Sequence, residues 1–261
     1  MSQAILEVNH VTAGYGDTEV LHDVSLAVYP AEVIGIVGQS GSGKTSLLNC
    51  VLQLEPNLEI SSGEILYSHQ NLLTLNRKAY RRLFQDEIAV IFQNSNFTLV
   101  PTRKISSQLY ETTRGRLTQV ETRQKAYRLF EQLELKNPER IFHGYPFELS
   151  IGMAQRVAVS LALMNDPSLL LCDEPTSALD VKSAFEMVRQ LKQLKKEKGM
   201  TMVVVTHNIA LAARLCDRIA VMHQGHIVEV QDTKTLIESP MHAYTKQLLA
   251  ALPKTEDLWN G

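Results

Sequence analysis

Short apolar segments alternate along the chain with longer segments of helical periodicity. Short, continuous apolar segments are typical of strands buried on both faces of a parallel sheet. Such segments cover residues 33–37, 88–92, 169–172 and 202–205, and only the first of them is interrupted, by Gly35. By contrast, residues 181–198 carry apolar side chains at helical spacing and are followed by Gly199. This pattern predicts a helix that ends at the glycine.

Weaker patterns predict the remaining elements. Residues 5–8 and 20–28 alternate between apolar and polar side chains, as strands do, on either side of a turn-rich segment at 13–17. Other segments predict a β-hairpin at 219–230 with its turn at 223–226, a helix at 45–54, a largely helical block from about 94 to 166, and a tail helix at 235–252. Strands that alternate with helices predict an α/β class with a doubly wound core, to which the helical block and a small antiparallel part are added.

Composition narrows the possible partners. The chain has 261 residues, a formal net charge of -2 and 6% aromatic residues, so we expect no nucleic-acid partner, which would need a basic excess or stacking rings. Cys50, Cys172 and Cys216 lie far apart in apolar segments, and we expect buried, reduced thiols rather than a metal site. No uncharged apolar run reaches the ~18 residues of a spanning helix, so we expect a membrane role only through a partner subunit.

A glycine-rich loop carries the strongest chemical signal. Residues 38–45 fit the pattern G-x-x-x-x-G-K-[ST] between a predicted strand and a predicted helix. Glycines let backbone N–H groups wrap around phosphates, and the helix N-terminus adds the positive end of its dipole. We expect Lys44 to reach the β- and γ-phosphates and Thr45 to ligate Mg²⁺. The predicted nucleotide-binding residues are Gly38, Gln39, Ser40, Gly41, Ser42, Gly43, Lys44, Thr45 and Ser46.

Polar residues follow three of the predicted buried strands. Asp173 and Glu174 end one of them, where Asp173 can hold the Mg²⁺ water shell and Glu174 can deprotonate a water in line with the γ-phosphate. Gln93 follows a second strand and is a candidate contact for Mg²⁺ or the attacking water. His207 follows a third as a candidate γ-phosphate sensor. The predicted catalytic residues are therefore Glu174, His207 and Gln93, and the predicted Mg²⁺ residues are Thr45, Gln93 and Asp173.

Two further motifs complete a family pattern. Residues 149–156 read L-S-I-G-M-A-Q-R, one helix before the acidic strand end, and residues 177–180 read S-A-L-D. With the phosphate loop, Gln93, the acidic pair and His207 in this order, the chain resembles the ATP-binding-cassette ATPase family over nearly its full length. The resemblance implies a P-loop NTPase (RecA-like) core with an antiparallel β subdomain and a helical signature subdomain. It implies one cassette over 1–261, with core 1–93 and 167–234, helical subdomain 94–166 and C-terminal tail 235–261.

The resemblance also implies how such a chain works. Its cofactors would be ATP and Mg²⁺, and two cassettes, as a homodimer or heterodimer, would close head to tail around ATP. Ser150 and Gly152 would contact a nucleotide bound to the partner cassette, and Asp180 would lie at the same interface. Tyr15 occupies the place of an aromatic residue that stacks on adenine. The other implied partners are two transmembrane permease subunits and an extracytoplasmic solute-binding protein, at the cytoplasmic face of the inner membrane.

Within the family, the chain looks like the peptide and nickel importer branch. Residues 145–150 are similar to the branch's approach to the signature, and residues 239–246 resemble its His-Pro-Tyr-Thr tail, with Ala243 in place of the proline. No cysteine cluster follows that tail, which favours the nickel or metal-chelate type. Ile151 replaces the first signature glycine, and a β-branched side chain there is expected to weaken the site that this signature completes.

Two other functions are alternatives to a transport ATPase. A soluble cassette that serves a cytosolic complex, of the phosphonate-breakdown type, would have a similar tail. A small-molecule P-loop kinase would explain Lys44 but would leave the signature, Asp180 and His207 without a role. His223 and His226 lack an acid or cysteine at ligand spacing, so a turn is the expected role for them rather than a metal site.

Overall fold

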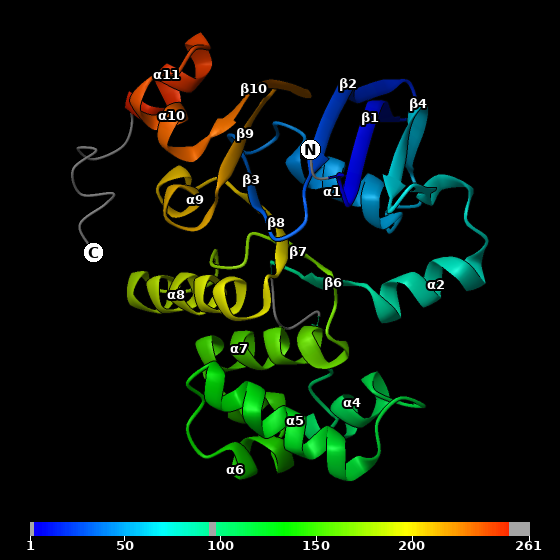
Figure 1. Ribbon diagram of the computed structural model, residues 1–261, viewed down its shortest axis with the longest axis vertical. Helices are drawn as coiled ribbons and strands as arrows, with labels where there is room; N and C mark the ends of the chain where they lie inside the picture. The colour runs from blue at the N-terminus through cyan, green and yellow to red at the C-terminus, as the bar shows by residue number, and fades with distance from the viewer. Residues whose placement is uncertain (1–2, 94–97, 251–261) are drawn as a thin grey trace. The chain divides into compact units, whose positions relative to one another are not determined.

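A computed structural model describes residues 3–93 and 98–250 of the chain (Figure 1). The chain divides into two compact units: residues 1–80 with 194–261, here called the first unit, and residues 81–193, the second unit. Helices α2 (Arg77–Asp86) and α8 (Val181–Lys198) run across the divisions. In the part of the chain that is described, no helix is at once long and apolar enough to cross a lipid bilayer.

An antiparallel sheet forms one part of the first unit. Strand β1 (Leu6–Tyr15) pairs with β2 (Thr18–Val28) on one side and with β4 (Leu58–Tyr67) on the other, and β4 pairs with the short β5 (Gln70–Asn71). Strand β1 continues to Tyr15, so the turn predicted at 13–17 was too long, and only residues 16–17 separate β1 from β2. Apolar side chains of β1 alternate inward, which buries one face of this sheet.

A mainly parallel group of strands forms the other part of the first unit. Strand β3 (Val33–Val37) runs parallel to β8 (Thr201–Thr206) and to β9 (Arg218–His223), and β10 (His226–Asp232) pairs antiparallel with β9. Every residue of β3 and β8 is buried, as their apolar sequences predicted. Helix α1 (Lys44–Leu52) contacts β2, β4 and β8, so it connects the two groups of strands.

The C-terminal part of the first unit differs from the prediction. The predicted tail helix is in fact two helices, α10 (Thr233–Glu238) and α11 (Ala243–Ala250), and the predicted residues 251–252 lie outside the described part. The break falls around Pro240, whose ring and missing N–H are incompatible with a helix interior. Helix α9 (Ile209–Leu215) was not predicted. The β-hairpin at 219–230 is confirmed, with a tighter turn at residues 224–225.

The second unit combines a parallel strand pair with a group of helices. Strand β6 (Ile88–Ile91) runs parallel to β7 (Leu169–Asp173), in the register Ile91 opposite Cys172. The largely helical block is confirmed over its described residues, where it consists of separate helices: α4 (Ile105–Thr112), α5 (Gln119–Gln132), α6 (Pro138–His143) and α7 (Ile151–Ala162), with 3-10 turns at Pro146–Glu148 and Leu163–Asn165. The α8 prediction at 181–198 is confirmed.

All three cysteines are buried and reduced, as expected. Burial raises the pKa of the Cys50 thiol to about 12. Burial and the nearby negative charge of Asp173 also raise the pKa of Cys172. Because the thiolate is the reactive form, these side chains act as small apolar groups rather than nucleophiles.

Candidate functional site

The phosphate loop connects β3 to α1 in the first unit. At its first position an added Cβ would lie 2.2 Å from the Met222 carbonyl oxygen, so only glycine fits as residue 38. At Gly43 the backbone has φ 101°, a conformation that favours glycine, and this residue caps the N-terminus of α1. The sequence therefore places glycine at two points of the loop where a Cβ would lie within 3 Å of atoms of the neighbouring strands.

Lys44 holds the loop in its present form. Its Nζ donates hydrogen bonds to the carbonyl oxygens of Gly38 and Gln39, both at 2.8 Å, and lies 3.4 Å from Ser42 Oγ. The side chain is only 5% exposed. A buried ammonium surrounded by backbone groups, at the N-terminus of a helix, fits the phosphates of a nucleotide. The outer positions Gln39, Ser40, Gly41 and Thr45 are exposed, so the loop is accessible from solvent.

Of the predicted catalytic residues, His207 belongs to the same unit as this loop and follows the strand next to β3. Val37 of β3 lies opposite Thr206 of the parallel β8, so Gly38 and His207 leave adjacent strands at the same edge. Neighbouring strands are about 4.8 Å apart. Tyr15, by contrast, ends β1 with 38% exposure and pairs with Thr18 and Leu58, neither of which belongs to the loop.

The acidic pair and Gln93 come together in the second unit. Ile91 of β6 lies opposite Cys172 of β7, and this is the last pair of the two parallel strands. Gln93 comes two residues after Ile91 and Glu174 two residues after Cys172, so both leave the strand pair at the same edge. Glu174 has φ 45°, which is rare for a residue with a side chain. Its carbonyl oxygen accepts hydrogen bonds from the N–H and the Oγ of Ser177, both at 3.1 Å.

The signature residues lie at the N-terminus of α7, also in the second unit. Ser150 is the N-cap, and its Oγ accepts a hydrogen bond from the Met153 N–H at 3.3 Å. Near the start of α8, Ser183 donates two hydrogen bonds to the Asp180 carboxylate, from its N–H at 3.0 Å and from its Oγ at 2.7 Å, and these bonds lower the pKa of Asp180. A Cβ on Gly152 would lie 3.6 Å from Ser183 Oγ. Two helix N-termini, each with a positive dipole end, therefore meet beside Gly152.

Two contacts to the phosphate loop were missed by sequence reasoning. The Gln39 N–H donates a hydrogen bond to the Tyr244 Oη at 3.1 Å, and the Gly225 N–H donates one to the Ser42 carbonyl oxygen at 3.0 Å. Both partners are more than 180 residues away along the chain. Local patterns hold no signal for such pairs, although the tail that contains Tyr244 resembles that of the peptide and nickel importer branch.

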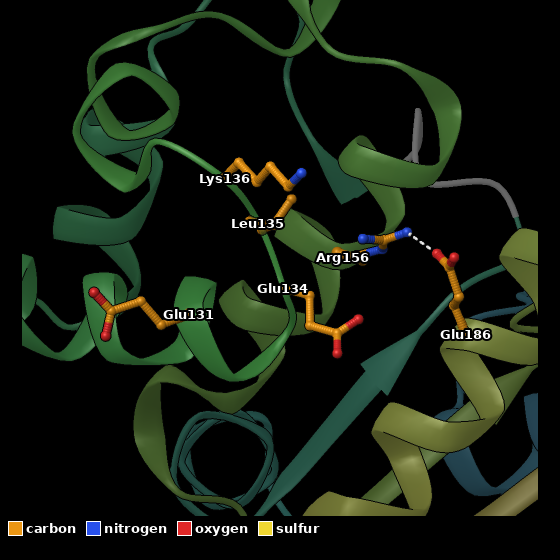
Figure 2. A pocket seen from close by; sticks show the side chains of 6 residues that line it. All are labelled: Glu131, Glu134, Leu135, Lys136, Arg156 and Glu186. Atoms are coloured by element: carbon orange, nitrogen blue, oxygen red, sulfur yellow. Dashed lines mark hydrogen bonds and ion pairs between the residues drawn. The ribbon is translucent and has the colours of Figure 1, made fainter.

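A hollow of about 570 Å³ in the second unit is a separate feature (Figure 2). Arg156 Nη2 and Glu186 Oε2 form an ion pair at 2.7 Å across one side, and Glu134 pairs with Arg189 at 2.6 Å. None of the predicted site residues lines this hollow, whose walls are Glu131, Glu134, Leu135, Lys136, Arg156 and Glu186. Among the residues that are described, no three His, Cys, Asp or Glu side chains are grouped as metal ligands.

Comparisons with known proteins agree on one family. A family model described as "ABC transporter" matches residues 21–177. The peptidoglycan transport ATP-binding protein YejF of Agrobacterium fabrum is 38% identical over 98% of this chain, and the dipeptide transport ATP-binding protein DppD of Caldanaerobacter subterraneus is 37% identical over 95% of it. The chain spans 48% of the first relative's length and 78% of the second's.

Solved structures show the same relationship. The dimeric structure of MJ0796, described as a bacterial ABC transporter cassette, is 31% identical with a TM-score of 0.76, and the match covers 87% of this chain and 98% of that one. A second MJ0796 structure, described as a post-hydrolysis state bound to ADP and Pi, is 30% identical with a TM-score of 0.75 over the same shares of both chains.

Proposed function

The chain belongs to the ABC transporter family as an ATP-binding-cassette ATPase, and from this premise we propose that it hydrolyses ATP to energise the import of a solute. The observation that carries the proposal is the phosphate loop, in which the buried Lys44 ammonium lies among backbone carbonyls at the N-terminus of α1. Phosphoryl transfer depends mainly on positioning and on neutralising charge, and this loop supplies both.

We assign a role to each predicted site residue. Lys44 neutralises the β- and γ-phosphates, and residues 38–46 supply backbone and hydroxyl hydrogen bonds. Glu174 accepts the proton of the attacking water, Gln93 orients that water and His207 holds the γ-phosphate. The groups available to a Mg²⁺ ion are Thr45, Gln93 and Asp173, and the ion would neutralise charge on the phosphates. The exposed ring of Tyr15 is proposed to stack on adenine.

We propose that a second cassette completes the site. The Ser150 hydroxyl and the N-termini of α7 and α8 offer hydrogen-bond donors and positive dipole ends to an anion on another molecule. Asp180 organises the start of α8 beside them. Within this proposal the cassette keeps the predicted subdivision into a core (1–93 and 167–234), a helical subdomain (94–166) and a tail (235–261).

Ile151 gives a prediction about the shared site. Its side chain is 62% exposed at the first position of α7, next to the donors offered by Ser150 and Gly152. Replacing it with glycine should let phosphate approach more closely, and a better-placed anion at a helix N-terminus is worth ~0.3–1 kcal/mol, or about two- to fivefold in turnover. The measurement is the ATPase rate of the assembled cassette pair. Ile151→Val, which keeps the β-branch, is the control, and equal rates for both variants would contradict the prediction.

For the solute, we propose a peptide. The relatives named above are peptidoglycan and dipeptide transport proteins, which supports this class; a nickel or metal-chelate solute stays a prediction from the resemblance. The proposed partners are a second ATPase subunit, two transmembrane permease subunits and an extracytoplasmic solute-binding protein. The chain would then lie peripherally at the cytoplasmic face of the inner membrane.

Co-purification tests the transport proposal. The tagged chain, recovered from detergent-solubilised membranes, is expected to bring two membrane-spanning subunits with it. In proteoliposomes of that complex, binding protein loaded with a dipeptide should stimulate ATP hydrolysis more than binding protein supplied with nickel. Recovery with soluble enzymes alone would instead support the alternative, an ATPase of a cytosolic complex. Stimulation only by nickel would keep the importer and overturn the peptide assignment.

A further inference from the structure

The C-terminal tail is fixed to the first unit by a buried carboxylate. Glu229 of β10 accepts hydrogen bonds from the N–H groups of Met241 at 2.8 Å and His242 at 3.0 Å, just before α11. Burial alone would raise the pKa of Glu229, but the hydrogen bonds that its carboxylate accepts from the Met241 and His242 N–H groups lower this pKa on balance. The charged form is therefore the one that the folded tail prefers. Figure 1 shows α10 and α11 following β10 at the end of the described chain.

Tyr244 extends this attachment to the phosphate loop. The side chain is 7% exposed, and its ring stacks on His223 with the centroids 3.8 Å apart and an angle of 23° between the planes. His223 ends β9, directly after Met222, whose carbonyl lies against Gly38. The Tyr244 N–H donates a hydrogen bond to His242 Nδ1 at 3.2 Å. These contacts fix both the ring and the backbone of Tyr244, and they therefore also fix the position of its hydroxyl at the loop.

The hydroxyl contacts one particular peptide group. The Gln39 N–H, which donates to Tyr244 Oη at 3.1 Å, belongs to the same peptide plane as the Gly38 carbonyl, which accepts from Lys44 Nζ at 2.8 Å. The peptide bonds described are free of the cis form, so these two groups point in opposite directions. The Gly38–Gln39 peptide is therefore held at both ends, by Lys44 on one side and by the tail on the other.

We propose that Tyr244 is a positioning residue of the nucleotide site, through which the C-terminal tail sets the conformation of the phosphate loop. The inference rests on the proposed function, because the loop that Tyr244 contacts is the one proposed to bind the phosphates. The Tyr244 hydroxyl holds the first peptide of this loop independently of Lys44, whose ammonium is then available to the nucleotide. The loop then keeps the form in which its other N–H groups face the phosphates.

A pair of conservative variants tests the inference. Tyr244→Phe keeps the ring, its stacking and its packing but removes the hydroxyl. One neutral hydrogen bond corresponds to about three- to tenfold in affinity, so the dissociation constants for MgATP and MgADP should rise by that factor while kcat at saturation stays nearly unchanged. The matched control is Tyr80→Phe, which removes a tyrosine hydroxyl bonded to the Leu52 carbonyl at the other end of α1. The control should leave nucleotide affinity as it is in the wild type.

Amide exchange without nucleotide supplies a direct second readout. The Gln39 amide should exchange faster in Tyr244→Phe than in the wild type, and Tyr80→Phe should not change it. Equal nucleotide affinity and equal Gln39 exchange in Tyr244→Phe and the wild type would overturn the inference. A wild-type protein that binds no nucleotide would instead refute the proposed function, and the exchange measurement would still decide whether the tail holds the loop.

Discussion

Replacing Glu174 with glutamine is expected to lower the ATP turnover of the assembled protein by about 10²–10⁴-fold, which is the usual contribution of a general base. Binding of ATP should remain close to that of the wild type, because phosphate recognition belongs to Lys44 and the loop around it. The measurement compares kcat from phosphate release with the ATP dissociation constant from equilibrium titration. A fall in kcat without a matching rise in the dissociation constant is the expected result.

The backbone at Glu174 makes this substitution interpretable. The residue has φ 45° and its carbonyl is held by two hydrogen bonds from Ser177. Glutamine has the same length and shape as glutamate, so the variant should keep the backbone conformation of Glu174. What changes is the ability of the side chain to accept a proton from water. A loss of turnover can therefore be assigned to the chemistry of the carboxylate rather than to a misfolded strand end.

Glu134→Gln is the matched control for that experiment. It removes the same charge from the same unit, at an exposed ion pair with Arg189. An exposed pair contributes about 0–1 kcal/mol to stability, so this variant should keep both its fold and its turnover. Unchanged turnover in Glu174→Gln would contradict the assignment of Glu174 as the general base. His207 would then be the candidate for that role.

Buried strands and long helices could be predicted from the sequence because their patterns are set by local burial. Strand β3 and helix α8 follow from the apolar run at 33–37 and the periodicity at 181–198. Strand β4 was missed because most of its residues are at least partly exposed and Gly63 interrupts it with φ 90°, so its alternation is weak. Helix α9 is short and largely apolar, and it therefore lacks the contrast of an amphipathic face.

The candidate site shows the same division between local and long-range information. The loop at 38–45 is a continuous motif, so its position between β3 and α1 could be predicted. The neighbourhood of Gly38 and His207 depends on β3 and β8 being adjacent. The sequence could indicate that polar residues follow buried strands, where ligands bind in parallel sheets, but not which strands are neighbours. The hydrogen bond from Gln39 to Tyr244 joins residues 205 apart, and no local pattern encodes such a pair.

Replacing Lys44 with alanine is expected to abolish most of the stabilisation that MgATP gives to the folded protein. Two charge-assisted hydrogen bonds to phosphate are worth roughly 3 kcal/mol or more, so affinity should fall at least about 100-fold. At an ATP concentration 100 times the wild-type dissociation constant, the wild type gains about 2.7 kcal/mol and the variant about 0.4 kcal/mol. For a protein of this size, these gains correspond to thermal shifts of roughly 5–11 °C and about 1 °C.

The comparison within each variant separates binding from stability. Without nucleotide, Lys44 Nζ bonds the Gly38 and Gln39 carbonyls, so its loss should itself destabilise the protein by about 1–3 kcal/mol. Measuring the Tm of each protein with and without MgATP removes that term, because only the nucleotide-dependent shift is compared. Lys125→Ala is the control, since it removes a lysine that pairs with Asp166 in the second unit and should keep the full shift. A Lys44→Ala protein that still shows the wild-type shift would mean that the loop does not bind the phosphates.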